Sequence, residues 1–76
     1  MVSDRQRFER ARKALHWTRA VTAGYLGCTV NAIFRYETAH EDHQRAVPPH
    51  ALDWIEAVAR DFREMMKRHP RPKAEP

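Results

Sequence analysis

The sequence predicts an all-α protein, a compact helical bundle that contains a helix-turn-helix. Apolar side chains recur three and four residues apart in several segments, and residues that cap helices precede the first three of them. Glycine and β-branched residues are sparse, which argues against sheets. With 76 residues, the chain has room for one domain with one small core. We expect helices over residues 4–15, 19–26, 30–37 and 49–68, within a domain of residues 1–69.

The first predicted helix follows Ser3, which can cap it. Gln6 stands three residues later, as a capping box requires. Phe8, Ala11 and Leu15 fall on one side of this helix, which predicts the side that packs into the core. The Arg and Lys residues lie mostly elsewhere, and we expect them to form a solvated face.

The second and third predicted helices are short and close together. Thr18 and Thr29 are the expected N-caps. Gly27 directly follows the second helix, where glycine adopts the left-handed conformation that ends a helix. Two short helices joined by a tight turn with a glycine have helix-turn-helix geometry. The residues that we expect to point inward are Ala20, Ala23, Leu26, Ile33 and Tyr36.

The fourth predicted helix begins at two consecutive prolines, and proline is tolerated in a first helical turn. Its first half is expected to cover the core. Phe62, Met65 and Met66 lie at least two turns further on, where a small domain has little left to cover, and methionine adapts well to interfaces. We therefore expect these three residues to form a homodimer interface. The alternative is that the helix packs back over a monomer core.

Two segments show no helical pattern. Residues 38–47 are polar and predict a loop, and residues 70–76, with several prolines and no large apolar side chain, predict a disordered tail. The loop holds His40 and His43, but no cysteine and no helical spacing accompanies them, so we expect no metal site.

The formal net charge of +4 is unevenly distributed. Residues 1–35 hold seven basic residues against two acids, whereas residues 36–53 hold one arginine against four acids. A basic half is suited to a polyanion such as DNA. On charge alone, a solvated helix face explains the same pattern equally well.

Several classes of protein are disfavoured. The single cysteine, Cys28, has no partner for an internal disulfide, which suits the reducing cytoplasm. The start of the chain is too charged for a signal peptide, and no apolar run is long enough to span a membrane. No nucleophile–base pair or phosphate-binding glycine loop is present, so we expect no enzyme, no cofactor and no small-molecule substrate.

The segment 19–38, RAVTAGYLGCTVNAIFRYET, resembles the Cro/C1-type (XRE-like) helix-turn-helix family of phage repressors and small bacterial regulators. The residues that match the typical run of this family in register are Thr18, Ala23, Leu26, Gly27, Ile33, Arg35, Tyr36 and Glu37. The resemblance extends over about residues 8–59. Arg19 and Ala20 depart from the usual Gln-Glu pair. Thr22 replaces an apolar residue, a contact that we expect Val21 to supply after a small rotation of the helix.

The resemblance implies that the third helix lies in the major groove of double-stranded DNA. Asn31 then pairs with adenine, and Arg35 reaches guanine or a phosphate. Val30 and Phe34 can touch thymine methyl groups. Thr29 and Arg19 are expected to hold phosphates, which position the protein without reading sequence.

The function implied is that of a cytoplasmic transcriptional repressor, a homodimer on an inverted-repeat operator. Its size suggests a regulator of its own phage or anti-CRISPR operon. An antitoxin of the same fold is an alternative. A protein-interaction module is another, with Phe34, Trp54 and Phe62 as anchors for a partner.

Overall fold

The structure is a computed structural model that describes residues 2–40, 42 and 44–68. The chain forms the helices α1 (Asp4–Ala14), α2 (Arg19–Leu26), α3 (Val30–Glu37) and α4 (Pro49–Arg68). The described residues contain no strand, and the predicted all-α class is confirmed. The predicted helix bounds agree with the structure except that α1 ends one residue earlier. The predicted tail, 70–76, lies outside the described residues.

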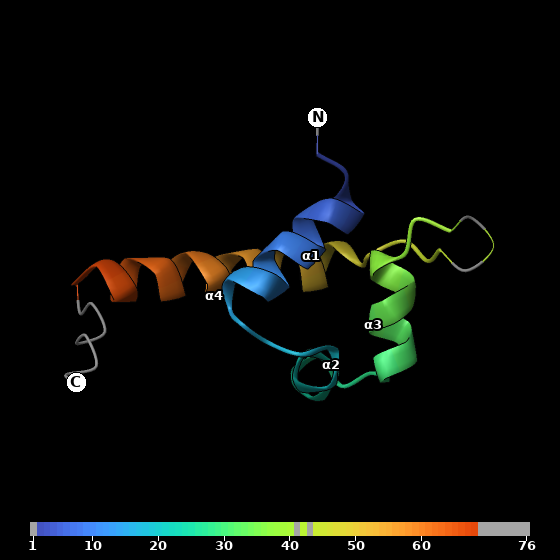
Figure 1. Ribbon diagram of the computed structural model, residues 1–76, viewed down its shortest axis with the longest axis horizontal. Coiled ribbons are helices and arrows are strands. Elements are labelled where there is room, and N and C mark those ends of the chain that lie inside the picture. Colours follow the sequence, from blue (N-terminus) through green and yellow to red (C-terminus); the bar gives the residue numbers. More distant parts are fainter. Residues whose placement is uncertain (1, 41, 43, 69–76) are drawn as a thin grey trace, which may run out of the picture.

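The long helix α4 packs against α1 along its first half (Figure 1). α1 packs against both α4 and α3, and α2 packs against α3. In Figure 1, α2 and α3 lie below and to the right of α1, and the C-terminal half of α4 extends to the left, beyond the other helices. The helix-turn-helix therefore sits at one end of the molecule.

The core forms where α1, α3 and α4 meet. Phe8, Ile33 and Ile55, one from each of these helices, are completely buried. The ring of Phe8 contacts that of Tyr36 edge-on, with 5.8 Å between centroids. The predicted inward side of α1 is confirmed, and the first half of α4 covers the core as expected. The other buried apolar residues are Ala11, Leu15, Ala23, Ala32, Val47, Ala51, Leu52 and Ala59.

The helix caps follow from the local sequence, as predicted. The Ser3 hydroxyl accepts from the Gln6 N–H, and the Gln6 side chain accepts from the Ser3 N–H, which completes the capping box. The Thr18 and Thr29 hydroxyls cap α2 and α3 by accepting from the N–H groups of Val21 and Ala32, without a reciprocal side-chain bond. Gly27 ends α2 in the left-handed conformation, at φ 68°.

The expected orientation of α2 is wrong by part of a turn. Ala20, which we expected to point inward, is exposed. Val21 is 43% exposed, so it does not make the inward apolar contact that we expected it to supply in place of Thr22. Thr22 is itself completely buried. Its hydroxyl donates to the Thr18 carbonyl at 2.9 Å, which satisfies its polar atom inside the helix and lets its methyl group pack inward.

Polar contacts also fix the packing of α1 on α4 and the position of the loop after α3. The Arg7 guanidinium on α1 forms a bidentate ion pair with Glu56 on α4, with 2.9 Å between Nε and Oε2. The hydrogen bond to Glu56 raises the pKa of Arg7 above its ordinary value. The predicted loop after α3 returns along that helix, because the Arg45 N–H donates to the Arg35 carbonyl at 3.0 Å.

Candidate nucleic-acid interface

The outer face of α3 collects the residues that were predicted to read base edges. Val30 and Phe34 are 49% and 41% exposed, and Asn31 and Arg35 are also exposed. The opposite side of the helix is buried through Ala32, Ile33, Tyr36 and Glu37. Thr29 stands at the start of the helix, where its hydroxyl accepts from the Ala32 N–H at 3.1 Å. α3 is therefore held by one side and presents the other to solvent.

This outer face has an apolar half and a polar half. Val30 and Phe34 are four residues apart, so they lie one turn apart on the same side of the helix. Asn31 and Arg35 repeat this spacing one residue later, which places them beside the apolar pair. The polar half offers hydrogen-bonding groups, and the apolar half offers only van der Waals contact.

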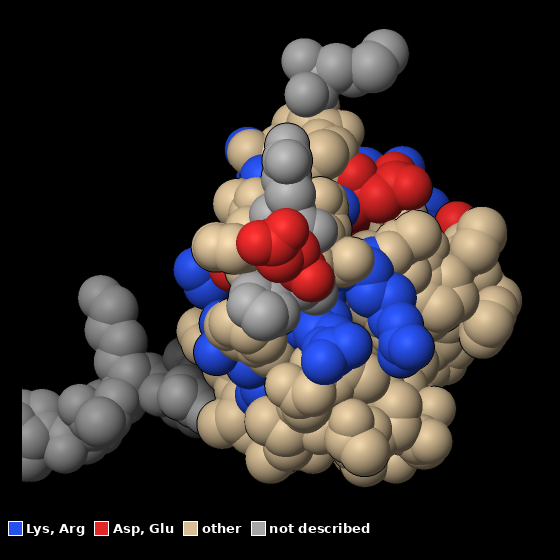
Figure 2. Space-filling model, turned by 90° about the vertical axis from the view of Figure 1, so that its right-hand side faces the viewer, with Lys and Arg blue, Asp and Glu red and all other residues tan. Residues whose placement is uncertain are grey.

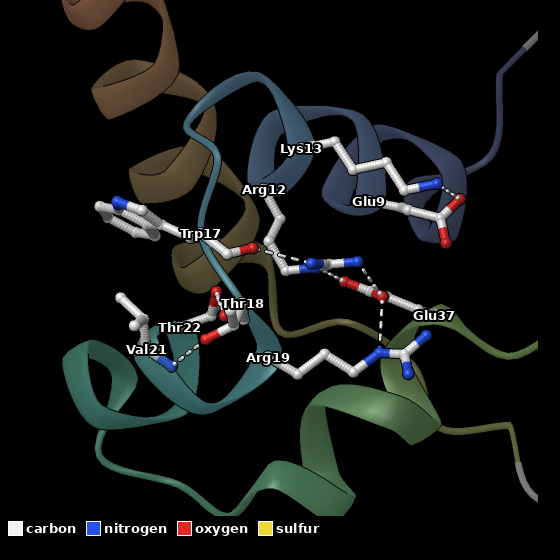
Figure 3. A network of polar contacts seen from close by, with 9 residues as sticks. All are labelled: Glu9, Arg12, Lys13, Trp17, Thr18, Arg19, Val21, Thr22 and Glu37. Atoms are coloured by element: carbon white, nitrogen blue, oxygen red, sulfur yellow. Dashed lines mark hydrogen bonds and ion pairs between the residues drawn. The ribbon is translucent and has the colours of Figure 1, made fainter.

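Arg19, at the start of α2, reaches across to α3 (Figure 3). Its Nε donates to Oε1 of Glu37 at 3.2 Å. Its guanidinium carbon also lies 5.6 Å from the centre of the Phe34 ring, within the range of a cation–π contact. The side chain is 43% exposed, so it borders the outer face of α3 and is not sealed in the core.

Glu37 is the centre of a buried ionic network that ties three helices together (Figure 3). Its side chain is 1% exposed. Arg12 of α1 binds it through two nitrogens, with 2.5 Å from Nε to Oε2 and 3.0 Å from Nη2 to Oε1. The third nitrogen of Arg12 donates to the Trp17 carbonyl at 2.8 Å. A buried carboxylate requires such compensation, because an unpaired charge in the core is strongly destabilising.

The expectation of a solvated basic face on α1 is wrong for Arg12, which is 9% exposed. The position of Glu37 in the sequence indicates that another helix has to supply a buried basic residue. It lies four residues after the buried Ile33 and one after Tyr36, so it falls toward the buried side of α3. A carboxylate at such a position needs a basic partner from another helix.

Positive side chains gather around this site. Figure 2, which faces the end formed by α3 and the following loop, shows Lys and Arg across the middle of that face. Acidic side chains lie between and above them, and uncharged side chains lie below and to the right. The network itself combines two arginines with one glutamate, so one positive charge remains, at the more exposed Arg19.

The predicted dimer residues lie at the far end of α4 and have different environments. Met65 is 52% exposed. Phe62 is half-buried, packs against the core and meets the His16 ring edge-on at 6.5 Å between centroids. Met66 is half-buried and lines a pocket with His16 and Phe62. Part of this surface therefore covers the chain's own core, and Met65 remains the most exposed of the three.

An aromatic cluster that the sequence reasoning did not find joins α2 to α4. The rings of Trp17 and Tyr25 are stacked at 4.7 Å between centroids, and Trp54 lies 5.9 Å from Trp17. Tyr25 and Trp54 are 65% and 39% exposed. Trp54, a partner anchor only in the alternative of a protein-interaction module, has Trp17 and Tyr25 as neighbours within the chain.

Within the described part of the chain, no helix is long and apolar enough to cross a membrane. The same residues contain no group of three or more His, Cys, Asp or Glu side chains placed to hold a metal ion. Comparison with protein-family models, with curated proteins and with solved structures found no match for this chain.

Proposed function

We propose that the protein is a sequence-specific DNA-binding transcriptional repressor that acts as a homodimer on an inverted-repeat operator. The observation that carries this proposal is the outer face of α3. It presents Asn31 and Arg35 beside Val30 and Phe34 on a helix anchored by its opposite side. The resemblance of residues 19–38 to XRE-like regulators supports the same function.

The dimensions of the two molecules are compatible. An α-helix with its side chains is about 10–12 Å across, and the major groove of B-DNA is about 12 Å wide. With α3 in the groove, Asn31 can bind adenine through two hydrogen bonds, and Arg35 can bind guanine in the same way. These are the contacts that distinguish one sequence from another.

Phosphate contacts would fix the orientation of the helix in the groove. Arg19 is the best candidate because Glu37 holds its Nε, while the other two guanidinium nitrogens point away from that carboxylate (Figure 3). An arginine held in place loses less conformational freedom on binding a phosphate. Thr29 and the N–H groups at the start of α3 can contact a second phosphate.

The homodimer is proposed through the distal part of α4, with Met65 at its centre. A small domain gains buried apolar surface by pairing, and a two-fold dimer presents two recognition helices about 34 Å apart, one turn of DNA. A dimer bound across a promoter excludes other proteins from that DNA, which is repression. By resemblance, the target is the chain's own phage or anti-CRISPR operon.

Selection from a random duplex library tests the proposal. We expect wild-type protein to enrich one inverted repeat. Asn31→Ala and Arg35→Ala should each weaken binding to it by about 5- to 150-fold, which corresponds to the loss of one bidentate base contact. Arg60→Ala, an exposed arginine on α4, is the matched control and should change affinity little. Unchanged helix content by circular dichroism verifies the fold of each variant. Failure to enrich any sequence would refute the proposal.

A second candidate function, a protein-interaction module or an antitoxin that binds a protein, is favoured by the exposed rings of Tyr25 and Trp54 in the aromatic cluster. The salt dependence of binding affinity distinguishes these two functions. Affinity for DNA through several phosphates falls steeply as salt rises, whereas affinity through an aromatic surface does not.

A further inference from the structure

We propose that the pocket beside the end of α1 binds an amphipathic organic anion, a carboxylate with an apolar tail. The pocket lies where the last turns of α4 pass His16, which closely follows α1, and it has a volume of about 510 Å³. This volume falls within the range of pockets that hold small ligands. The residues that line it are His16, Phe62, Arg63, Met66 and Lys67.

The wall that α4 supplies has an apolar half and a cationic half. Phe62 and Met66 are one helical turn apart and half-buried, and they form the apolar half. Arg63 and Lys67 repeat this spacing one residue later and are exposed, so their charges border the apolar surface. Among the described residues, none of those that line the pocket is acidic. A ligand with an apolar body and a negative group matches both halves.

The two cations are available to a ligand. Within the described part of the chain, Arg63 forms no ion pair. Lys67 has Glu64 as a partner at 3.9 Å, but both side chains of this pair are largely exposed, so water already weakens their attraction. The planar guanidinium of Arg63 can bind a carboxylate through two nitrogens, and the Lys67 ammonium can donate a further bond.

His16, the lining residue on the side of α1, is held in an uncommon backbone conformation. Its φ is 59°, in the left-handed region that favours glycine, and its N–H donates to the Lys13 carbonyl at 3.0 Å. Gly27 has a similar φ, 68°, at the end of α2. Glycine would end α1 with less strain, whereas histidine adds a ring that meets Phe62 edge-on, at 6.5 Å between centroids. This ring completes the pocket and offers an N–H to the carboxylate.

The pocket shares Phe62 and Met66 with the surface that we propose for the homodimer. A ligand that covers these two side chains withholds them from a second copy of the chain, so the ligand and the dimer compete. This consequence rests on the proposed function, whereas the pocket and the chemistry of its ligand do not. The anion then acts as an effector that weakens binding to the operator.

Titration of the wild-type protein with sodium octanoate, followed by calorimetry and NMR, tests the site. We expect saturable binding, with nuclear Overhauser effects from the octanoate tail to the Met66 methyl group and the Phe62 ring. From butyrate to octanoate, affinity should rise about fourfold with each added methylene, the effect of burying one such group. Octyltrimethylammonium has the same tail and the opposite charge, and it should not bind in the pocket. Equal binding of the two probes, or contacts of the tail with Tyr25 and Trp54 instead, would overturn the site.

Protein variants assign the charge recognition to named side chains. Arg63→Gln combined with Lys67→Gln should weaken octanoate binding about tenfold, the loss of a charge-assisted hydrogen bond, and leave the affinity for octanol unchanged. Arg60→Gln combined with Arg68→Gln removes the same charge from exposed positions of α4 outside the pocket and is the matched control. His16→Gly should also weaken octanoate binding. Because this variant relieves the left-handed strain, a loss of fold does not explain that result.

Sedimentation distinguishes the site from its effect on the dimer. We expect octanoate to shift the wild-type protein from dimer to monomer at concentrations that saturate the pocket, and to lower its affinity for the selected duplex. If octanoate contacts Met66 but the dimer persists, the site stands and the competition is overturned. If the protein is a monomer without octanoate, the proposed dimer is wrong, and the contacts of the octanoate tail still decide whether the site exists.

Discussion

At the scale of single residues, the two glycines have opposite roles although they lie three positions apart. Gly24 is inside α2, and Gly27 follows it at φ 68°. A Cβ added at either position meets no atom within 4 Å, so packing does not decide the effect of a substitution. The backbone conformation decides it.

We predict that Gly27→Ala lowers the free energy of unfolding by about 1 kcal/mol, because L-residues are strained in the left-handed region. Gly24→Ala should raise it by about 0.5–1 kcal/mol, because alanine is the better helix former. Urea unfolding followed by circular dichroism measures both. Changes of the same sign in the two variants would contradict this account.

The sequence predicted those residues whose conformation depends on near neighbours. The caps at Ser3, Thr18 and Thr29 and the turn at Gly27 are determined within three residues, and the structure has all of them. The exposed face of α3 also follows from local periodicity.

The sequence did not predict contacts between distant positions. Arg12 and Glu37 are 25 residues apart, and their pairing depends on how α1 crosses α3. The Trp17–Tyr25–Trp54 cluster likewise requires α4 to lie beside α2. The burial of Thr22 was missed because its hydroxyl is satisfied by a bond within its own helix, which a polar–apolar pattern does not reveal.

At the scale of the elements, the Glu37 network sets how α1, α2 and α3 sit together. We predict that Glu37→Ala destabilises the protein by roughly 3–5 kcal/mol, because it leaves buried Arg12 without its counter-charge. A loss of this size approaches the total stability of a small domain. Thermal unfolding followed by circular dichroism should show a much lower or absent transition.

Glu9→Ala is the matched control. Half-buried Glu9 and exposed Lys13 form a surface pair on α1 at 3.8 Å, and surface pairs contribute only about 0–1 kcal/mol. If Glu37→Ala were no more destabilising than Glu9→Ala, the network would not be what holds the three helices in place.

At the scale of the whole molecule, the proposed dimer predicts the effect of a charge at Met65. Wild-type protein should sediment as a dimer, and Met65→Glu as a monomer with unchanged helix content, since Met65 is already 52% exposed. The variant should bind an isolated half-site normally and the inverted repeat more weakly. Arg60→Glu introduces the same side chain at another exposed position of α4 and should leave the dimer intact. A monomeric wild type would overturn the dimer.

The central claim is that the outer face of α3 contacts DNA. The most direct measurement is a titration of the ¹⁵N-labelled protein with the selected duplex, followed residue by residue by NMR. We predict that the amide shifts change most at residues 18–20 and 29–35 and reverse as salt is raised. Changes confined to Tyr25 on α2 and to α4, which holds Trp54, with α3 unaffected, would contradict the account and favour the protein-interaction function.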